Sequence, residues 1–277
     1  RWLFYKDMAF YINTLLPVGP ALAGRIMGKR VVYHYHENAF VKGTFYKVLA
    51  TIMQKLAHEI ICVSEYQASF LQQKKCVITI PNALPQNFVN RLTPNFKIAF
   101  ERKTILMLGS LKLYKSPLEF IELAKRLPQF VFVLVISDTK ENIDIFIEKY
   151  KINVYKNLTI YPRQNDVVPF YNQASLVLNL SDKKQVVETF GLTALEAMSA
   201  GLPVIVPTEG GIAEMVVDGE NGYKIDVQNL NQIAECIKTI LSDETLYMEL
   251  AQNALAYSKR FSEAKMVNSI EMILNRK

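Results

Sequence analysis

Short apolar runs alternate with amphipathic stretches along most of the chain. The apolar runs have the length and β-branched content of buried strands, and the stretches between them place apolar residues at helical spacing. In the first part, the expected strands are residues 8–12, 29–35, 59–63 and 77–80, and the expected helices are 20–27, 43–57 and 65–72. Such alternation is typical of a parallel sheet covered on both faces. The pattern predicts an α/β fold.

Residues 81–103 interrupt this pattern. They hold three prolines and four asparagines without a sustained period, which is the composition of a linker. We therefore expect a domain boundary here, with a first domain over residues 1–98 and a second over 99–277. The last helix of the chain is expected to pack back on the first domain.

A second strand–helix series follows the interruption. Its expected strands are 104–108, 130–136, 158–161, 176–180 and 203–206, and its expected helices are 117–126, 141–149, 167–172, one after Gly191 and two at the C-terminus. Two Rossmann-like domains in tandem bind a ligand in the cleft between them, outside the carboxyl ends of the strands. We expect a ligand at those ends.

Composition and charge narrow the class of protein. The chain has no apolar run of the roughly 20 residues that cross a bilayer, and its three cysteines lack metal-ligand spacing, so we expect reduced thiols in a cytoplasmic protein. Residues 1–100 carry 12 Lys and Arg against 4 Asp and Glu, a balance of +8, whereas residues 101–277 carry 20 against 22. The basic half suits an anionic membrane surface or a phosphorylated acceptor, and a solvated basic face without a partner is the alternative. Nucleic-acid motifs are absent.

Two carboxylates stand eight residues apart at the start of one expected helix. Glu188 lies in the loop before it, Gly191 at its beginning and Glu196 beyond its first turn. A helix start favours an anionic phosphate, and glycine lets the backbone approach closely. Carboxylates accept hydrogen bonds from vicinal hydroxyls. The arrangement suits a nucleotide sugar, with a diphosphate between two polyols. The alternative is that both are ordinary acidic residues of one helix.

The whole stretch resembles the donor-binding signature of retaining glycosyltransferases of family 4, which adopt the GT-B fold. The matching residues are Glu188, Phe190, Gly191, Leu192, Glu196, Ala197, Met198, Gly201, Pro203, Val204, Gly210, Gly211 and Glu214. The resemblance implies that Glu188 binds donor-sugar hydroxyls and Glu196 the ribose. It also implies that the backbone amides of Phe190, Gly191 and Leu192 hold the sugar and the distal phosphate.

A second segment, residues 106–116, resembles the turn that opens the family's donor domain. Gly109 matches the family's glycine, and Lys115 stands where the family keeps a lysine against the diphosphate. Ser110 replaces the usual arginine and Ser116 the usual glycine. Lys112 is the candidate to restore the charge that Ser110 lacks. An exposed lysine at a helix start is the alternative for Lys115.

Two further site residues come from strand ends. His36, followed by Glu37, resembles the family's His-acid pair and would face the donor sugar and the acceptor, and a histidine satisfied within the fold is the alternative. His34 points to the same side of the strand but deeper, so we expect it in the core. Arg163 follows the strand near which the family reads the base, where it either contacts base or phosphate or lies on the surface.

Missing motifs exclude other reactions. No Asp-x-Asp occurs, so the resemblance implies transfer without a divalent metal and without a cofactor. The chain also lacks Gly-x-Gly-x-x-Gly, a Walker loop and Gly-x-Ser-x-Gly, which removes support for dehydrogenases, phosphate hydrolases and serine hydrolases.

The resemblance to this family implies a retaining hexosyltransferase. It would move a sugar from a nucleotide-diphosphate sugar to a glycan or lipid-linked acceptor in surface polysaccharide synthesis, with the leaving phosphate as the base. The basic, aromatic residues 1–6 invite a place at the inner face of the cell membrane, and the alternative is that they pack within the domain. Family members begin with further strand–helix units, so we expect an incomplete first domain. The alternatives are a non-catalytic or truncated nucleotide-sugar-binding protein and a GT-B-fold nucleotide-sugar epimerase.

Overall fold

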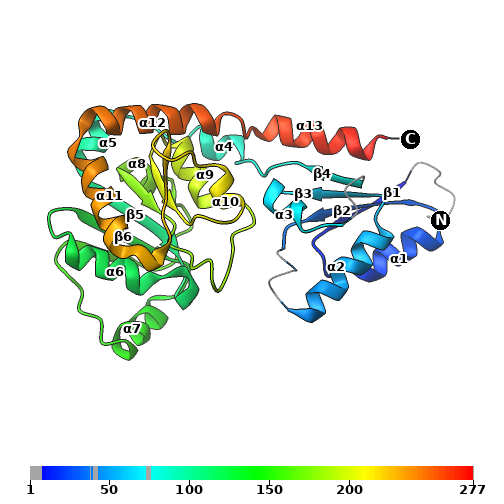
Figure 1. Cartoon of the computed structure of the whole chain (residues 1–277), viewed down its shortest axis with the longest axis horizontal. Coiled ribbons are helices and arrows are strands. Elements are labelled where there is room, and N and C mark those ends of the chain that lie inside the picture. The colour runs from blue at the N-terminus through cyan, green and yellow to red at the C-terminus, as the bar shows by residue number, and fades with distance from the viewer. Residues whose placement is uncertain (1–7, 38, 40–42, 73–75, 277) are drawn as a thin grey trace. The chain divides into compact units, whose positions relative to one another are not determined.

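The structure is a computed structural model that describes residues 8–37, 39, 43–72 and 76–276. The chain folds into two compact units (Figure 1). Unit 1 comprises Arg1–Ala83, Val187–Phe190 and Phe261–Lys277, and unit 2 comprises Leu84–Val186 and Gly191–Arg260. The division after Ala83 lies 15 residues before the boundary expected at residue 98. In the described part of the chain, no helix is long and apolar enough to cross a membrane.

Unit 1 is built on a four-stranded parallel sheet. Its strands lie in the order β1 (Ala9–Asn13), β2 (Arg30–Tyr35), β3 (Glu59–Cys62) and β4 (Val77–Thr79), and its helices are α1 (Val18–Ile26), α2 (Thr44–Leu56), α3 (Glu65–Ser69) and α13 (Glu263–Leu274). These strands begin and end within two residues of the positions expected from the apolar runs, because buried β-branched residues favour the strand locally.

Alternate residues of these strands face two different helical layers. Tyr33 and Cys62 pack with residues of α1 and α2 in one apolar cluster, whereas Val32 and Ile61 pack with Ile273 of α13 in another. In Figure 1, α13 lies on the side of this sheet away from α1 and α2. The period-2 alternation of a strand therefore gives unit 1 two cores, and α13 closes the second.

Unit 2 contains a six-stranded parallel sheet. Its strands are β5 (Thr104–Gly109), β6 (Val131–Ile136), β7 (Leu158–Tyr161), β8 (Leu176–Leu178), β9 (Val204–Val206) and β10 (Gly222–Lys224), in the spatial order β10-β9-β8-β5-β6-β7. The two central strands are β5 and β8. Strand β8 is buried along its whole length and β5 at residues 105–107, as expected for a parallel sheet covered by helices.

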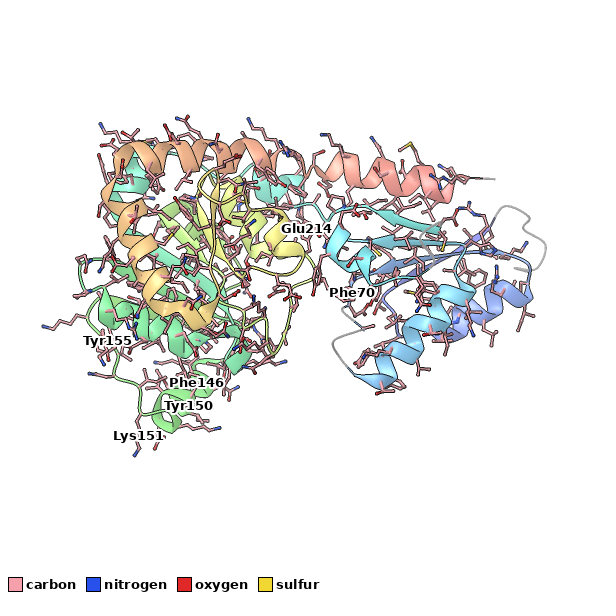
Figure 2. The ribbon with its side chains drawn as sticks, viewed as in Figure 1. Phe70, Phe146, Tyr150, Lys151, Tyr155 and Glu214 are labelled. Atoms are coloured by element: carbon pink, nitrogen blue, oxygen red, sulfur yellow. The ribbon has the colours of Figure 1, made fainter. Side chains whose placement is uncertain are left out.

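Helices flank the sheet of unit 2 (Figure 1). They are α4 (Gln86–Val89), α5 (Phe96–Arg102), α6 (Pro117–Arg126), α7 (Lys140–Lys149), α8 (Val168–Gln173), α9 (Leu192–Ser199), α10 (Gly211–Glu214), α11 (Leu230–Ser242) and α12 (Glu244–Ser258), with 3-10 turns η3 (Leu113–Lys115) and η4 (Val227–Asn229). Helix α12 packs on α5 and α9, and α11 packs on α6. Figure 2 shows α7 ending where Tyr150 packs on Phe146, with ring centroids 4.6 Å apart.

Two expectations about regular structure are wrong. Residues 81–103 are not an irregular linker, because they contain α4 and α5, whose four and seven residues are too short to show a period. The Asn95 side chain caps α5 by accepting a hydrogen bond from the Ile98 amide at 3.1 Å. The chain also ends in three helices, α11 to α13, rather than two.

Candidate functional site

The order of strands in unit 2 places a ligand-binding position between β5 and β8. From β5 the chain adds β6 and β7 on one side, and then returns to pair β8 with the other side of β5. In open α/β sheets, ligands bind outside the carboxyl ends of the strands where the order reverses in this way. This switch point, where the strand order reverses, lies beside Gly109, which ends β5, and Asn179, which follows β8.

Lys115 bridges the two strands at this switch point. Its Nζ donates to Ser181 Oγ at 3.3 Å, and the Asp182 amide donates to the Tyr114 carbonyl at 2.8 Å, so the loops after β5 and β8 are joined. The Nζ atoms of Lys112 and Lys115 lie 5.7 and 5.9 Å from the centroid of the Tyr114 ring. Two ammonium groups therefore gather around one ring where an anionic diphosphate would be expected.

The turn after β5 leaves room near the backbone of Gly109. A Cβ added to Gly109 would meet nothing closer than 3.9 Å, and the neighbouring Ser110 is half-buried. Ser116 adopts a left-handed conformation with φ 56°. This conformation accounts for the glycine that the family places there, because a residue without Cβ adopts it without strain.

Helix α9 begins at a glycine that no other residue replaces easily. Gly191 has φ 91°, and a Cβ at this position would lie 2.5 Å from the side chain of Ile212. Within the described residues, the backbone N–H groups of Gly191 and Leu192 have no hydrogen-bond acceptor. These unpaired amides at the positive end of the helix dipole are suited to an anion.

Glu196 is held by a buried tyrosine. Tyr171 of α8 is 1% exposed, and its hydroxyl donates to Glu196 Oε2 at 2.5 Å. Burial raises the pKa of the Glu196 carboxyl, and the hydrogen bond from Tyr171 partly lowers it. Burial, with the adjacent carboxylate, also holds the pKa of Tyr171 well above its ordinary value. The phenol therefore stays protonated and acts as the donor to the carboxylate.

Asn179 links the end of β8 to the first turn of α9. Its Nδ2 donates to Thr193 Oγ1 at 3.2 Å, and its Oδ1 accepts from the Ser181 amide at 3.1 Å. Sequence reasoning missed Asn179, Ser181 and Tyr171. The position of Asn179 and Ser181 directly after a buried strand was the available signal, whereas no local pattern marks Tyr171.

Arg163 lies after β7, at the far side of β6 from the switch point. Its Nη2 donates to the Ser137 carbonyl at 2.9 Å, and its amide donates to the Asp138 carbonyl at 2.8 Å. The exposed side chain therefore joins the carboxyl ends of β6 and β7. A contact with a base or phosphate stays a prediction.

The remaining predicted residues belong to unit 1. His36 is half-buried at the end of β2, with Nε2 2.7 Å from Asn13 Oδ1. The rings of His34 and His36 lie 4.1 Å apart between centroids, in agreement with the expected shared side. His34 is buried, its Nδ1 is 2.5 Å from the Tyr11 hydroxyl, and Glu37 accepts from the Leu15 amide at 3.1 Å.

Glu188 and Phe190 also belong to unit 1, unlike Gly191 and Leu192 that follow them. The Ser64 hydroxyl donates to the Thr189 carbonyl at 2.6 Å, which fixes the backbone directly after Glu188. The Phe190 ring is buried and packs edge-on against Phe261 at 5.8 Å. Phe190 therefore offers a ligand its backbone rather than its side chain.

The predicted residues thus fall into two groups. Unit 2 places Gly109, Ser110, Lys112 and Lys115 after β5, Gly191, Leu192 and Glu196 on α9, and Arg163 after β7, and unit 1 holds His36, Glu188 and Phe190. The basic, aromatic residues 1–6 lie outside the described residues. No group of three or more His, Cys, Asp or Glu that could hold a metal ion occurs among the residues that the structure describes.

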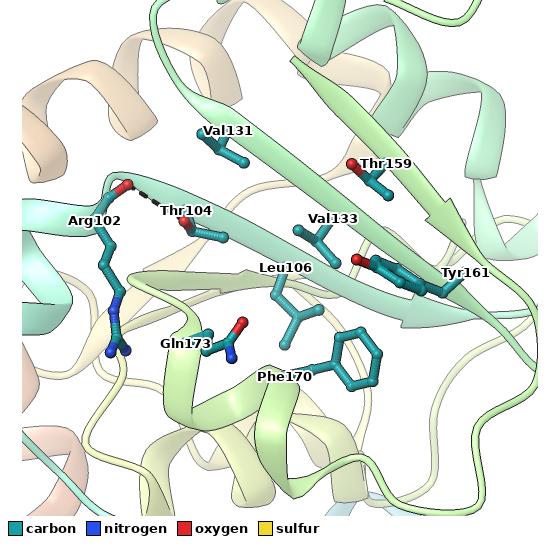
Figure 3. A pocket seen from close by; sticks show the side chains of 9 residues that line it. All are labelled: Arg102, Thr104, Leu106, Val131, Val133, Thr159, Tyr161, Phe170 and Gln173. Atoms are coloured by element: carbon teal, nitrogen blue, oxygen red, sulfur yellow. Dashed lines mark hydrogen bonds between the residues drawn. The ribbon is translucent and has the colours of Figure 1, made fainter. Parts of the chain in front are cut away.

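A hollow of about 350 Å³ with a mixed polar and apolar lining lies elsewhere in unit 2 (Figure 3). Leu106, Val133 and Thr159 form part of its lining on one face of the sheet, and Tyr161 packs edge-on against Phe170 at its side. None of the predicted site residues lines it. We place the candidate site at the switch point, because Lys115 bridges the loops after β5 and β8 there, and Asn179 links the end of β8 to the open start of α9.

Comparison with known proteins identifies the family of the chain. The family described as glycosyl transferases group 1 matches residues 90–257, which is more than half of the chain. An uncharacterized glycosyltransferase of Haemophilus influenzae is 24% identical over 282 residues, covering 98% of this chain and 75% of that protein. An uncharacterized glycosyltransferase of Methanocaldococcus jannaschii, MJ1178, is 29% identical over 240 residues, covering 84% of this chain and 63% of that protein.

Solved structures show the same fold. Anabaena Alr3699/HepE in complex with UDP-glucose has a TM-score of 0.80 and 21% identity, covering 96% of this chain and 78% of that one. The α/β fold with two parallel sheets that was expected from the sequence is confirmed as that of GT-B glycosyltransferases. With its fold and more than half of its length matched, the chain belongs to the glycosyl transferases group 1 family.

Proposed function

We propose that this chain is a retaining hexosyltransferase that uses a nucleotide-diphosphate sugar and a glycan or lipid-linked acceptor in surface polysaccharide synthesis. One observation carries the donor assignment. Lys115 spans the switch point between β5 and β8, with its ammonium 3.3 Å from Ser181 Oγ. A cation fixed where such sheets bind ligands is suited to the diphosphate of a donor.

The donor is proposed to lie across the start of α9. Lys115 and Lys112 offset the charge that grows on the leaving diphosphate, together with the open amides of Gly191 and Leu192. Glu196 accepts hydrogen bonds from the ribose, and Glu188 accepts them from the hydroxyls of the donor sugar. This order places the phosphates between the two polyols, with no metal ion in the scheme.

Retention follows from the proposed reaction at the anomeric carbon. The acceptor hydroxyl attacks on the face from which the diphosphate leaves, so that a C1–O bond to the acceptor forms as the C1–O bond to phosphate breaks. The hydroxyl proton passes to the leaving phosphate oxygen, which acts as the base. His36 is proposed to orient the donor sugar or the acceptor, and it carries no covalent intermediate.

The test is an incubation of the purified chain with UDP-, GDP- and ADP-hexoses, with glycan and lipid-linked acceptors present or absent. UDP-glucose belongs in the set because HepE is known in complex with it. We expect an acceptor-dependent product whose glycosidic bond has the anomeric configuration of the donor by NMR. An inverted product contradicts the proposal. A product without acceptor identifies an epimerase, and donor binding without any product identifies a non-catalytic binding protein.

The excess of basic residues in the first part of the chain supports a further proposal, a place at the inner face of the cell membrane. Binding to liposomes of anionic phospholipid should weaken as salt rises, because surface charges are screened. Equal binding to zwitterionic liposomes, or no binding at low salt, contradicts it.

A further inference from the structure

Glu196 offers one oxygen rather than two to a ligand. Oε2 accepts the hydroxyl of Tyr171 at 2.5 Å. Oε1 has no hydrogen-bond partner among the residues described, and the side chain as a whole is half-buried rather than enclosed. Leu192, one turn earlier on the same face of α9, is 45% exposed at the open start of the helix. Glu196 therefore lies on the same face of α9 as the exposed Leu192, and Oε1 is its open acceptor.

Further contacts, besides the hydrogen bond to Glu196, restrain Tyr171. It is fully surrounded, and the ring of Phe88 meets it edge-on with centroids 6.3 Å apart. Its carbonyl accepts from the Ala174 amide at 3.2 Å, where α8 turns into β8. A phenol with so little freedom holds a carboxylate oxygen at one point, and a charge-assisted hydrogen bond of this kind is strong.

We infer that Tyr171 is a positioning residue for ribose recognition, which fixes the plane of the Glu196 carboxylate so that Oε1 accepts from the 2′- and 3′-hydroxyls of the nucleotide. This assignment rests on the proposed function. This contact distinguishes between ligands, because a ligand without the 2′- and 3′-hydroxyls has no donor for Oε1. The pair therefore sets a preference for ribonucleotides over dideoxyribonucleotides and does not act on the phosphates.

The experiment compares two ligands in calorimetric titrations at pH 8, in the same buffer for every protein. The ligands are the nucleoside diphosphate that binds wild type, chosen from UDP, GDP and ADP, and its 2′,3′-dideoxy counterpart. The variants are Tyr171→Phe, Glu196→Gln and the double variant. Tyr247→Phe is the matched control, because Tyr247 is equally buried in unit 2 and its hydroxyl donates to the Ser175 carbonyl at 2.8 Å.

We expect Tyr171→Phe to weaken binding of the ribose form about tenfold and to leave the dideoxy form within twofold, which removes the preference for ribose. The double variant should bind no more weakly than Glu196→Gln alone, because Tyr171 acts through Glu196. Tyr247→Phe should keep the wild-type preference. Circular dichroism establishes that each variant is folded.

Several outcomes overturn the inference. If Tyr171→Phe weakens both ligands equally, or leaves the ribose form unchanged, Tyr171 does not position Glu196 for the ribose, while the proposed function stands. If the losses of the two single variants add in the double variant, Tyr171 acts independently of Glu196. If none of the three nucleoside diphosphates binds wild type, the proposed function fails and the inference fails with it.

Discussion

Burial disfavours the charged form of the Glu196 carboxyl group in the folded chain. Its pKa in the folded chain is raised above the ordinary value of 4.5, with burial as the larger cause and the Tyr171 hydrogen bond acting against it. Between 4.5 and the raised pKa the folded chain binds the proton more tightly than the unfolded chain. The free energy of unfolding therefore falls as pH rises through this window, and the penalty is complete above it.

We predict that Glu196→Gln separates stability from ligand binding. At pH 7 the variant should unfold in urea with a free energy at least as high as that of wild type, because the amide removes the buried charge and still accepts from Tyr171. This difference should shrink as pH falls toward 4.5, where protonation relieves the wild type. Nucleotide binding should weaken about tenfold. A variant less stable than wild type at pH 7 would show that the charge supports the fold.

Gly191 is predicted to tolerate no side chain. An alanine there would take the left-handed φ of 91° and place its Cβ 2.5 Å from Ile212. Gly219→Ala is the matched control, because Gly219 has φ 77° and nothing lies within 4 Å of its added Cβ. We expect Gly219→Ala to cost about 1 kcal/mol for the backbone conformation. Gly191→Ala should cost about 1–3 kcal/mol more for overpacking. Equal losses in urea denaturation would contradict the steric account.

At the scale of single elements, β2 contains a histidine that folds in its neutral form. Burial, and secondarily the charge of His36, lower the pKa of His34 from 6.5 to about 4. Since the unfolded chain takes up this proton near pH 6.5 and the folded chain does not, stability is complete above pH 6.5 and is lost as pH falls to about 4. Strand β2, which ends at Tyr35, is therefore sensitive to acid.

The test is the variant His34→Asn, whose side chain can still accept from Tyr11 but does not titrate. The free energy of unfolding of wild type should fall relative to the variant by up to about 3 kcal/mol between pH 7 and pH 4, from the conversion of 1.36 kcal/mol per pKa unit. Denaturation curves at several pH values, followed by circular dichroism, measure the difference. Parallel pH dependence in the two proteins would show that His34 protonates equally in the folded and unfolded chains.

Elements also show where sequence reasoning succeeds and fails. The strands from β1 to β9 were predicted because each contains a run of apolar or β-branched residues. Strand β10, with three residues, and the helices α4 and α5 were missed, because such short elements are stabilised by packing on unit 2 rather than by a local pattern. Phe96 of α5, for example, lies against Gly201, whose added Cβ would be 2.6 Å away.

Some residues of the candidate site were likewise predicted from the sequence, and others were missed. Glu196, Gly191 and Lys115 were predicted from motifs that are contiguous in the sequence. Tyr171 was not, because its hydrogen bond to Glu196 joins residues 25 positions apart through the packing of α8 and α9. Contacts of this kind depend on how the helices pack, and hydrophobic periodicity does not reveal them.

At the scale of the whole molecule, each of the two units has its own parallel sheet and core, and each holds some of the residues named in the proposal. Unit 2 holds the residues proposed for the nucleotide and phosphates, including Lys115 and Glu196. Unit 1 holds Glu188 and His36, which are proposed for the sugar and the acceptor. Binding of the nucleotide and transfer of the sugar should therefore respond to different substitutions.

The central claim is that Lys115 holds the donor diphosphate while Glu188 acts on the sugar. The most direct measurement combines calorimetric titration of the nucleoside diphosphate with the rate of sugar transfer, for wild type, Lys115→Gln, Glu188→Gln and Lys125→Gln. Lys125 is the control because it is an exposed lysine of α6 that pairs with Glu122.

We predict that Lys115→Gln weakens nucleotide binding at least tenfold, whereas Lys125→Gln leaves it within twofold. Glu188→Gln should bind the nucleotide as wild type does and lose about 2–4 kcal/mol of transition-state stabilisation in the transfer rate. Unchanged nucleotide binding by Lys115→Gln, or unchanged transfer by Glu188→Gln, would contradict the account.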